Sequence, residues 1–286
     1  MKKIIVLFSF VCSLVSADVA VAVSIIPQKS FVEAIGGDKV KVSVMVQPGD
    51  SPHTYEPKPS QMVAITKADA YFTIGVEFEK SWMERIKAQN SSMKLFDLSN
   101  GIIKIPIAEH HHEGESEHHH EDEESLDPHI WVSPSNVRII AKNIYEALVK
   151  LDAQNSDYYK QRYEHFLQSI DATDKEIREI LTKTPKGAKF MVFHPSWGYF
   201  ARDYNLEQLA IEAEGKNPKP QQIAYLIDEA KEEQVHAIFT SSEFSDIAAK
   251  QIAKEVGIPV LKISPLASNW SENLITLAQA IARSSE

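Results

Sequence analysis

Histidines are the residues of this chain best suited to chemistry, because imidazole nitrogens bind metal ions and exchange protons near neutral pH. The sequence contains eleven of them. Three share a setting, since His53 and His129 each follow a proline and His194 precedes one. Proline restricts the backbone and so helps to hold a neighbouring imidazole in place. A single such histidine is more often a structural residue, but three in matched settings favour one joint site.

Three imidazoles form a ligand set suited to Zn²⁺, which accepts a tetrahedral shell of three histidines and a fourth oxygen ligand. Mn²⁺ would favour more carboxylate ligands, and Ca²⁺ or Mg²⁺ would need nearly all oxygen. We therefore expect His53, His129 and His194 to bind Zn²⁺. A zinc with an open position can also activate water. The chain lacks a His-Glu-x-x-His motif, so a zinc-dependent hydrolase is the less favoured alternative and we expect no enzyme.

The other histidines receive different interpretations. We expect His165 to be a partly buried residue on the surface of a helix and His236 to pack at the start of a strand. The remaining six lie in residues 109–125, an acidic segment without an apolar residue. Such a segment should be a disordered loop. Its histidines could form weak sites that concentrate zinc, although a merely solvated acidic loop remains the alternative.

The elements that position these residues follow from the apolar pattern. Short runs rich in β-branched residues predict buried strands at 19–26, 40–46, 70–74, 189–193, 206–211, 235–240 and 260–263. Helical patterns lie between them, and alternating strands and helices predict an α/β fold with mainly parallel sheets flanked by helices.

A long helix is expected in the middle of the chain. Residues 155–183 contain no glycine or proline, and their apolar side chains recur at spacings of three and four. We expect this helix to join two lobes, with residues 18–154 forming the N-terminal lobe, 155–184 the rigid connection and 185–286 the C-terminal lobe. A helix packed on a single domain is the alternative.

The first residues predict export. Lys2 and Lys3 precede an apolar run at 4–15 that ends in small residues, so residues 1–17 have the pattern of a signal peptide cleaved after Ala17. The run is shorter than the roughly 20 residues of a membrane span. It contains Cys12, the only cysteine. We expect a periplasmic monomer with no disulfide and no membrane anchor after cleavage.

The charge of the chain bears on its partners. The formal net charge is −10, which argues against a nucleic acid partner because phosphate binding requires a basic face. Residues 109–124 hold eight acidic residues and no basic one. Most of the excess charge is therefore local.

Several motifs together resemble the ZnuA-type zinc-binding proteins of bacterial ABC importers, in the cluster A-I family of metal solute-binding proteins related to TroA. The resemblance covers nearly the whole mature chain and rests on residues 52–57, 59–61, the His-rich insert, 127–134, 193–194, 199–200 and 218–222. It implies two α/β lobes joined by a long helix, with metal in the cleft between them. It also implies zinc capture outside the cytoplasmic membrane and delivery to a membrane permease.

By the same resemblance, His53 and His129 would bind the metal from the N-terminal lobe and its edge, and His194 from the C-terminal lobe. Manganese-specific relatives tend to carry glutamate at the third position, so histidine favours zinc over a manganese or iron carrier. Relatives often have aspartate as the fourth ligand, but this chain has Ser264 there. A water molecule, Glu77 or Glu243 is left as a candidate for the fourth ligand.

Overall fold

The computed structural model describes residues 18–107, 126–212 and 216–283. The expected signal peptide and the His-rich segment at 109–125 lie outside the described residues. Among those described, no helix combines the length and the apolar character that crossing a bilayer requires.

Two four-stranded sheets form the framework, and every strand pair in them is parallel. The strand orders are β2-β1-β3-β4 and β6-β5-β7-β8. In each lobe the second strand of the sequence lies at one edge, followed by the first, third and fourth. The α/β prediction with parallel sheets is confirmed. The strands are β1 (Val19–Val23), β2 (Val40–Val44), β3 (Ala70–Thr73), β4 (Lys94–Asp97), β5 (Ala188–Val192), β6 (Leu206–Ala210), β7 (Ile238–Thr240) and β8 (Val260–Lys262).

The sequence pattern did not reveal β4. This edge strand pairs only with β3, and three of its four residues are exposed. It therefore lacks the apolar run that marks a buried strand.

Helices connect successive strands and cover the sheets. They are α1 (Ile26–Gly36), α2 (Pro59–Ile65), α3 (Glu77–Gln89), α4 (Pro134–Leu151), α5 (Ser156–Ile180), α6 (Gly198–Tyr204), α7 (Pro220–Glu232), α8 (Ile247–Val256) and α9 (Trp270–Ala282), with short 3₁₀ turns at Gly37–Lys39, Ile130–Val132, Ala153–Asn155 and Leu181–Lys183.

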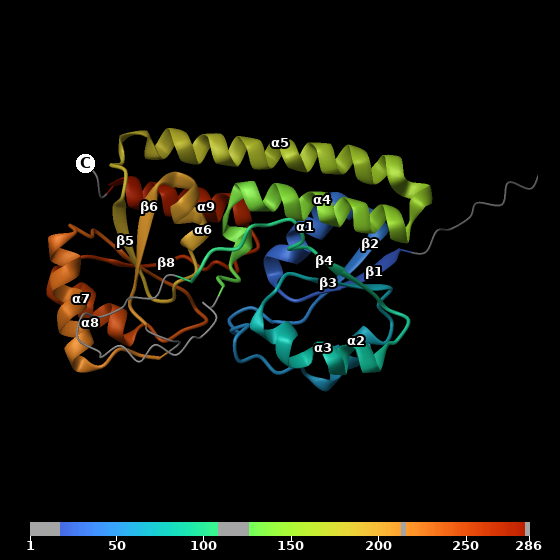
Figure 1. Ribbon diagram of the computed structural model, residues 1–286, viewed down its shortest axis with the longest axis horizontal. Coiled ribbons are helices and arrows are strands. Elements are labelled where there is room, and N and C mark those ends of the chain that lie inside the picture. Colours follow the sequence, from blue (N-terminus) through green and yellow to red (C-terminus); the bar gives the residue numbers. More distant parts are fainter. Residues whose placement is uncertain (1–17, 108–125, 213–215, 284–286) are drawn as a thin grey trace, which may run out of the picture.

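Helix α5 runs along one side of the molecule, past both sheets (Figure 1). Its buried face includes Tyr159, Ile170 and Ile177, which pack into a core shared with residues of both sheets. The long helix that joins the lobes thus has the predicted apolar stripe. Helix α9, the last of the chain, packs against α5, and its Trp270 meets Phe31 of α1 edge-on at 5.6 Å. The C-terminal helix therefore reaches back to the N-terminal lobe.

Hydrogen bonds fasten the two lobes together at several points. The indole nitrogen of Trp131 donates to the carbonyl of Pro265 (2.8 Å), and that of Trp270 donates to the carbonyl of Trp131 (2.7 Å). Tyr199 in α6 donates its hydroxyl to the carbonyl of Asp127 (2.9 Å). These buried bonds, together with α5, resist large relative movement of the lobes.

Candidate metal centre

The loops at the carboxyl ends of both sheets face each other across one cavity. Glu77 and His194 lie just beyond β3 and β5, His53 lies in the loop after β2, and Glu243 follows β7. Loops at the carboxyl ends of parallel strands are where α/β proteins bind ligands. The cavity between the lobes is lined by Pro52, His53, Val76, Glu77, Pro128, His129, Trp131, His194, Glu243, Phe244, Pro265 and Leu266.

His53 is carried by the loop between β2 and α2. Gln61 of α2 secures this loop, since its amide nitrogen donates to the carbonyl of Met45 (2.5 Å) and its amide oxygen accepts from the hydroxyl of Tyr55 (2.7 Å). The His53 side chain is 27% exposed. It is the most accessible of the three histidines.

His129 stands before the 3₁₀ turn that leads into α4, and it is only 4% exposed. One carboxylate oxygen, Oδ1 of Asp127, accepts from both the backbone N–H and the ring Nδ1 of His129, each at 2.8 Å. The ring is therefore fixed with its Nε2 directed away from Asp127.

His194 lies two residues beyond β5. Parallel pairing sets Val192 beside Ala210, so two residues further on His194 comes beside Glu212. The ring Nδ1 contacts Oε1 of Glu212 at 2.5 Å, and both residues are buried. Sheet register thus supplies a carboxylate partner for His194.

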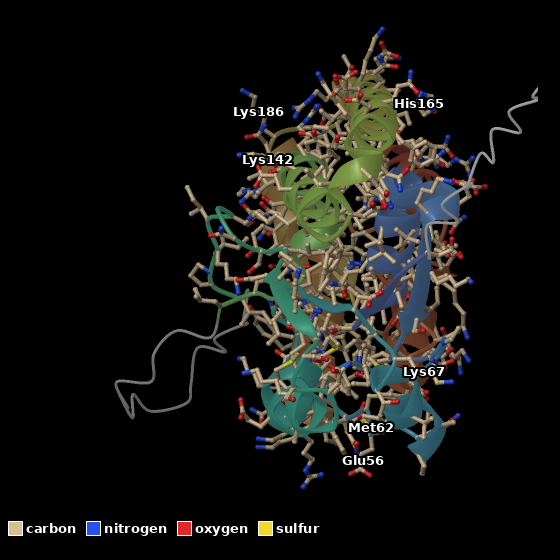
Figure 2. The ribbon with its side chains drawn as sticks, turned by 90° about the vertical axis from the view of Figure 1, so that its right-hand side faces the viewer. Glu56, Met62, Lys67, Lys142, His165 and Lys186 are labelled. Carbon is tan, nitrogen blue, oxygen red and sulfur yellow. The ribbon has the colours of Figure 1, made fainter. Side chains whose placement is uncertain are left out.

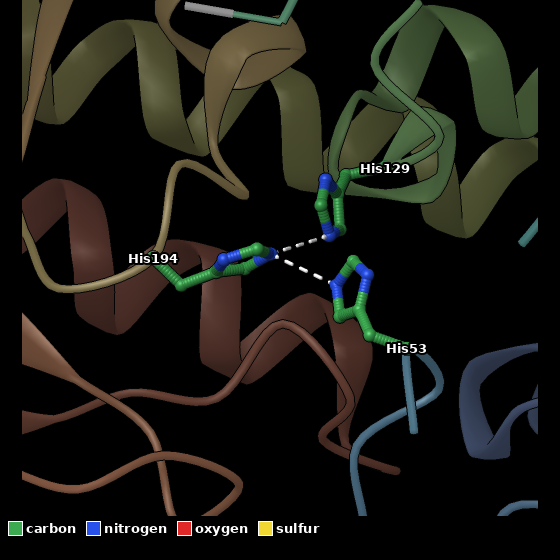
Figure 3. A group of neighbouring side chains, drawn as sticks. All are labelled: His53, His129 and His194. Atoms are coloured by element: carbon green, nitrogen blue, oxygen red, sulfur yellow. Dashed lines mark hydrogen bonds between the residues drawn. The ribbon is translucent and has the colours of Figure 1, made fainter. Parts of the chain in front are cut away.

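The three sequence-predicted histidines converge in the cavity (Figure 3). Nε2 of His194 lies 3.1 Å from Nε2 of His53 and 3.3 Å from Nε2 of His129. One nitrogen from each ring can be chosen so that all three lie within 4.8 Å of one another. A tetrahedral zinc with bonds of about 2.05 Å would hold its nitrogens about 3.3 Å apart.

All three rings turn Nδ1 to a carboxylate and Nε2 to the cavity. Nδ1 of His53 lies 3.2 Å from Oε2 of Glu77, which is an ion-pair distance, although that oxygen lacks a partner with hydrogen-bond geometry. Carboxylates at Nδ1 fix the ring orientation and strengthen Nε2 as a metal ligand. The arrangement is suited to holding a metal ion.

The environment changes the pKa of two groups at the site. Burial lowers the pKa of His194 to about 4, and this effect outweighs the hydrogen bond to Glu212, which acts in the opposite direction. Burial raises the pKa of Glu77, but its contact with His53 and the neighbouring imidazoles prevail and bring the pKa down to about 2. His194 is thus neutral, and able to bind metal, well below neutral pH.

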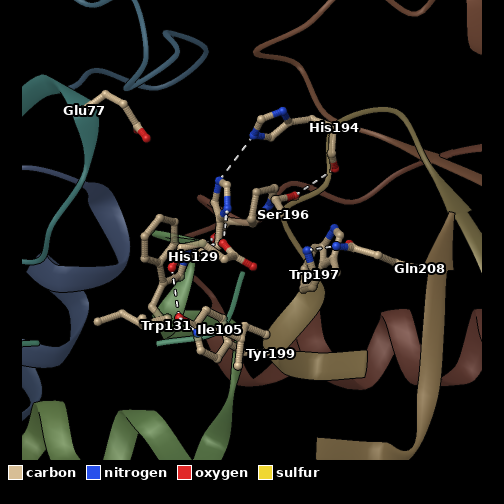
Figure 4. A network of polar contacts seen from close by, with 12 residues as sticks. Glu77, Ile105, His129, Trp131, His194, Ser196, Trp197, Tyr199 and Gln208 are labelled. Carbon is tan, nitrogen blue, oxygen red and sulfur yellow. Dashed lines mark hydrogen bonds and ion pairs between the residues drawn. The ribbon is translucent and has the colours of Figure 1, made fainter. Parts of the chain in front are cut away.

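Aromatic side chains and a polar network enclose the centre. Phe244 stacks on the His194 ring at 4.5 Å, and Trp131 meets the His129 ring at 5.4 Å. Figure 4 shows Glu77 directed toward the histidines and the polar contacts behind His129. In that network, Tyr199 accepts from the backbone N–H of Ile105 (3.3 Å) as well as donating to Asp127. Both lobes therefore hold the His129 loop.

The candidates for the fourth ligand differ in their existing bonds. The Ser264 hydroxyl donates to Oε1 of Glu243 (2.9 Å) and accepts from the backbone N–H of Leu266 (3.0 Å). Glu77 and Glu243 both line the cavity, and each has a buried Oε2 without a hydrogen-bond partner among the described residues.

Two histidines assigned no metal role lie elsewhere and are more exposed than expected. His165 is exposed on the outer side of α5 (Figure 2) instead of partly buried. His236 is also exposed, and β7 begins two residues later, so the prediction that it packs at the strand start was wrong. Its neighbour Val235 is the residue that packs inward.

The sequence analysis missed the supporting role of two carboxylates. Asp127 lies two residues before His129, a spacing that allows one carboxylate to reach both the backbone and the ring. Glu212 directly follows the predicted strand 206–211, just as His194 directly follows the predicted strand 189–193. These equivalent positions could have indicated that Glu212 lies beside His194. That inference, however, requires knowing that β5 and β6 are neighbours in the sheet.

Comparison with known proteins identifies the family. Residues 21–284 match the ZnuA family, described as "Zinc-uptake complex component A periplasmic". The chain belongs to this family. ZnuA-family proteins are metal-binding solute-binding components of ABC importers, located outside the cytoplasmic membrane and working with a membrane permease.

Individual relatives of the ZnuA family agree with this assignment. A crystal structure of ZnuA is 43% identical, with a TM-score of 0.85, over 94% of this chain and 100% of the other. The "High-affinity zinc uptake system protein ZnuA" of Bacillus subtilis is 31% identical, covering 81% of this chain and 73% of its own length. The "Iron-binding protein YfeA" of Yersinia pestis is 30% identical, covering 80% and 71%. The fold and the metal-binding class are therefore shared, while the metal differs among relatives.

Proposed function

We propose that this protein captures Zn²⁺ through Nε2 of His53, His129 and His194 and delivers it to the membrane permease of an ABC importer. The observation that carries the proposal is the approach of the three Nε2 atoms, with separations of 3.1 and 3.3 Å to His194. Those separations are close to the spacing of nitrogens on a tetrahedral zinc. Carboxylates at the three Nδ1 atoms support Nε2 as the ligand atom.

Zinc is preferred to iron or manganese because the converging donors are imidazole nitrogens. For such sites, affinity follows a series in which Zn²⁺ exceeds Fe²⁺ and Mn²⁺. Iron remains the second candidate, since a relative is named for binding it. A competition titration of Zn²⁺ against Mn²⁺ and Fe²⁺ separates the candidates, and zinc failing to win by a wide margin would contradict this part of the proposal.

The decisive experiment measures metal content and binding enthalpy by isothermal titration for the wild type and for His53→Ala, His129→Ala and His194→Ala. Each substitution should remove most of the high-affinity zinc binding. His165→Ala is the matched control, because this exposed histidine lies on the outer face of α5 (Figure 2). Retention of tight binding by all three variants would refute the proposed site.

The proposal also covers the exported form of the protein and the zinc binding of residues 109–124. We expect export with cleavage after Ala17, a monomer in solution and no hydrolase activity from the loaded protein. Mass spectrometry of the exported chain, light scattering and hydrolase assays check these points. Deleting residues 109–124 should remove only weaker, additional zinc equivalents, measured by the same titration.

A further inference from the structure

The metal cavity contains a carboxylate that supports none of the three histidine rings. Among the described lining residues, the ionisable ones are the three histidines, Glu77 and Glu243. Glu77 contacts the ring of His53, while Asp127 and Glu212 support the other two rings from behind the cavity. Glu243 has no such task.

The hydrogen bonds of Glu243 leave one oxygen free. Its Oε1 accepts from the hydroxyl of Ser264 (2.9 Å) and, more weakly, from that of Ser242 (3.4 Å). Its Oε2 is buried without a hydrogen-bond partner in the described part of the chain. An unpartnered buried carboxylate oxygen is unfavourable, so the free oxygen needs a cation or a donor.

The loop that carries Glu243 also packs against His194, one of the three proposed metal ligands. Phe244, the next residue, stacks on the ring of His194 with an interplanar angle of 25°. The histidine group whose donor atoms all lie within 4.8 Å does not include Glu243. This loop would therefore have to move to bring the carboxylate into contact with an ion at the three nitrogens.

The positive charge of a bound Zn²⁺ would favour this movement of the Glu243 carboxylate toward the ion. Three neutral imidazoles place no negative charge in direct contact with Zn²⁺, because Glu77, Asp127 and Glu212 face the Nδ1 atoms of the rings and not the ion. A carboxylate oxygen completes a tetrahedral shell and offsets half of the double charge of the ion. We propose that Glu243 is the fourth zinc ligand through Oε2, with Ser264 holding Oε1.

This inference rests on the proposed three-histidine site and adds a second ligand from the C-terminal lobe. His194 and Glu243 then approach the ion from that lobe, opposite His53. Occupancy of the site fixes the position of the β7–α8 loop. A permease that contacts this loop would meet different surfaces on loaded and empty protein.

The test compares Glu243→Gln and Glu243→Ala with Glu255→Gln, which removes the same charge from an exposed position on α8. Zinc affinity is measured by competition with a chromophoric chelator. Co²⁺ absorption spectra, which depend on ligand type and geometry, report the shell directly. Both Glu243 variants should weaken zinc binding by at least ~10-fold. Losing a residue that only supports a metal ligand already weakens binding by about 10-fold or more, and losing a ligand itself should cost no less. Their Co²⁺ spectra should change, and Glu255→Gln should match the wild type.

Other outcomes overturn the inference without touching the proposed function. Unchanged affinity and unchanged Co²⁺ spectra in both Glu243 variants would exclude Glu243 as a ligand. A spectral change in Glu77→Gln but not in Glu243→Gln would assign the position to Glu77. The proposed function fails separately, if the histidine variants retain tight zinc binding.

Discussion

Replacement of Glu212 tests whether sheet register supports the metal centre. Glu212 holds Nδ1 of His194 at 2.5 Å, and the side chains are 4% and 9% exposed. In Glu212→Gln the amide oxygen can still accept the Nδ1 proton, but the negative charge that strengthens Nε2 as a donor is lost. Loss of such a partner weakens metal binding by about 10- to 100-fold, or about 1.4 to 2.7 kcal/mol. Glu212→Leu also removes the acceptor and should cost more.

The pH dependence separates this explanation from proton competition. The charge of Glu212 favours the protonated form of His194 and raises its pKa, against the larger effect of burial. Removing that charge therefore makes His194 harder to protonate, and the weaker zinc binding of Glu212→Gln should persist at about pH 5.5 as well as at neutral pH.

Chelator competition at both pH values measures the effect of Glu212→Gln. Glu207→Gln is the matched control, since Glu207 is an exposed carboxylate on β6, five residues earlier. If Glu212→Gln binds zinc as tightly as the wild type, or if Glu207→Gln loses as much affinity, the reasoning is refuted.

Three further predictions concern the supporting structure. Gly198→Ala would bring a Cβ to 2.7 Å from Oδ2 of Asp127. The carboxylate that holds His129 would have to shift, so zinc affinity should fall in calorimetry; unchanged affinity would show that Asp127 can shift freely. The metal-free protein should lose stability to urea as pH falls from 6.5 to about 4, because only unfolded chains protonate His194 there, and a His194→Gln variant with the same slope would contradict this. Replacement of Ile170 on the buried face of α5 by alanine should cost about 2 to 5 kcal/mol in the same urea titration; a cost below that range would mean that the shared core does not depend on Ile170.

The local pattern of the sequence was enough to predict most elements. Seven of the strands and the long helix follow from apolar periodicity, which reflects burial of one face or of both. The ligand candidates followed from residue type, since few side chains other than histidine suit zinc and prolines flanked these three. Both kinds of inference use only neighbours in the chain.

The boundaries and the edge strand were harder to predict. The expected strand at 235–240 begins only at Ile238, because the pairing with β5 and β8 starts at that residue. Strand β4 has no continuous apolar run, and its pairing with β3 is what defines it. Such features depend on contacts that a local pattern does not contain.

Residue type and spacing determined which groups could bind the ion, and tertiary structure decided how they are held. Pairing of β5 with β6 sets Glu212 beside His194. The packing of both lobes against α5 brings His53 close to His194, although 141 positions separate the two residues in the sequence. Hydrogen bonds from Nδ1 to Asp127 and Glu212 orient the rings of His129 and His194, and Glu77 lies at ion-pair distance from Nδ1 of His53. Glu77 and Glu212 both come from other parts of the chain than the histidines they face. Contacts between residues that are distant in sequence arise from the folding of the whole chain, so they cannot be predicted from the pattern of a short segment.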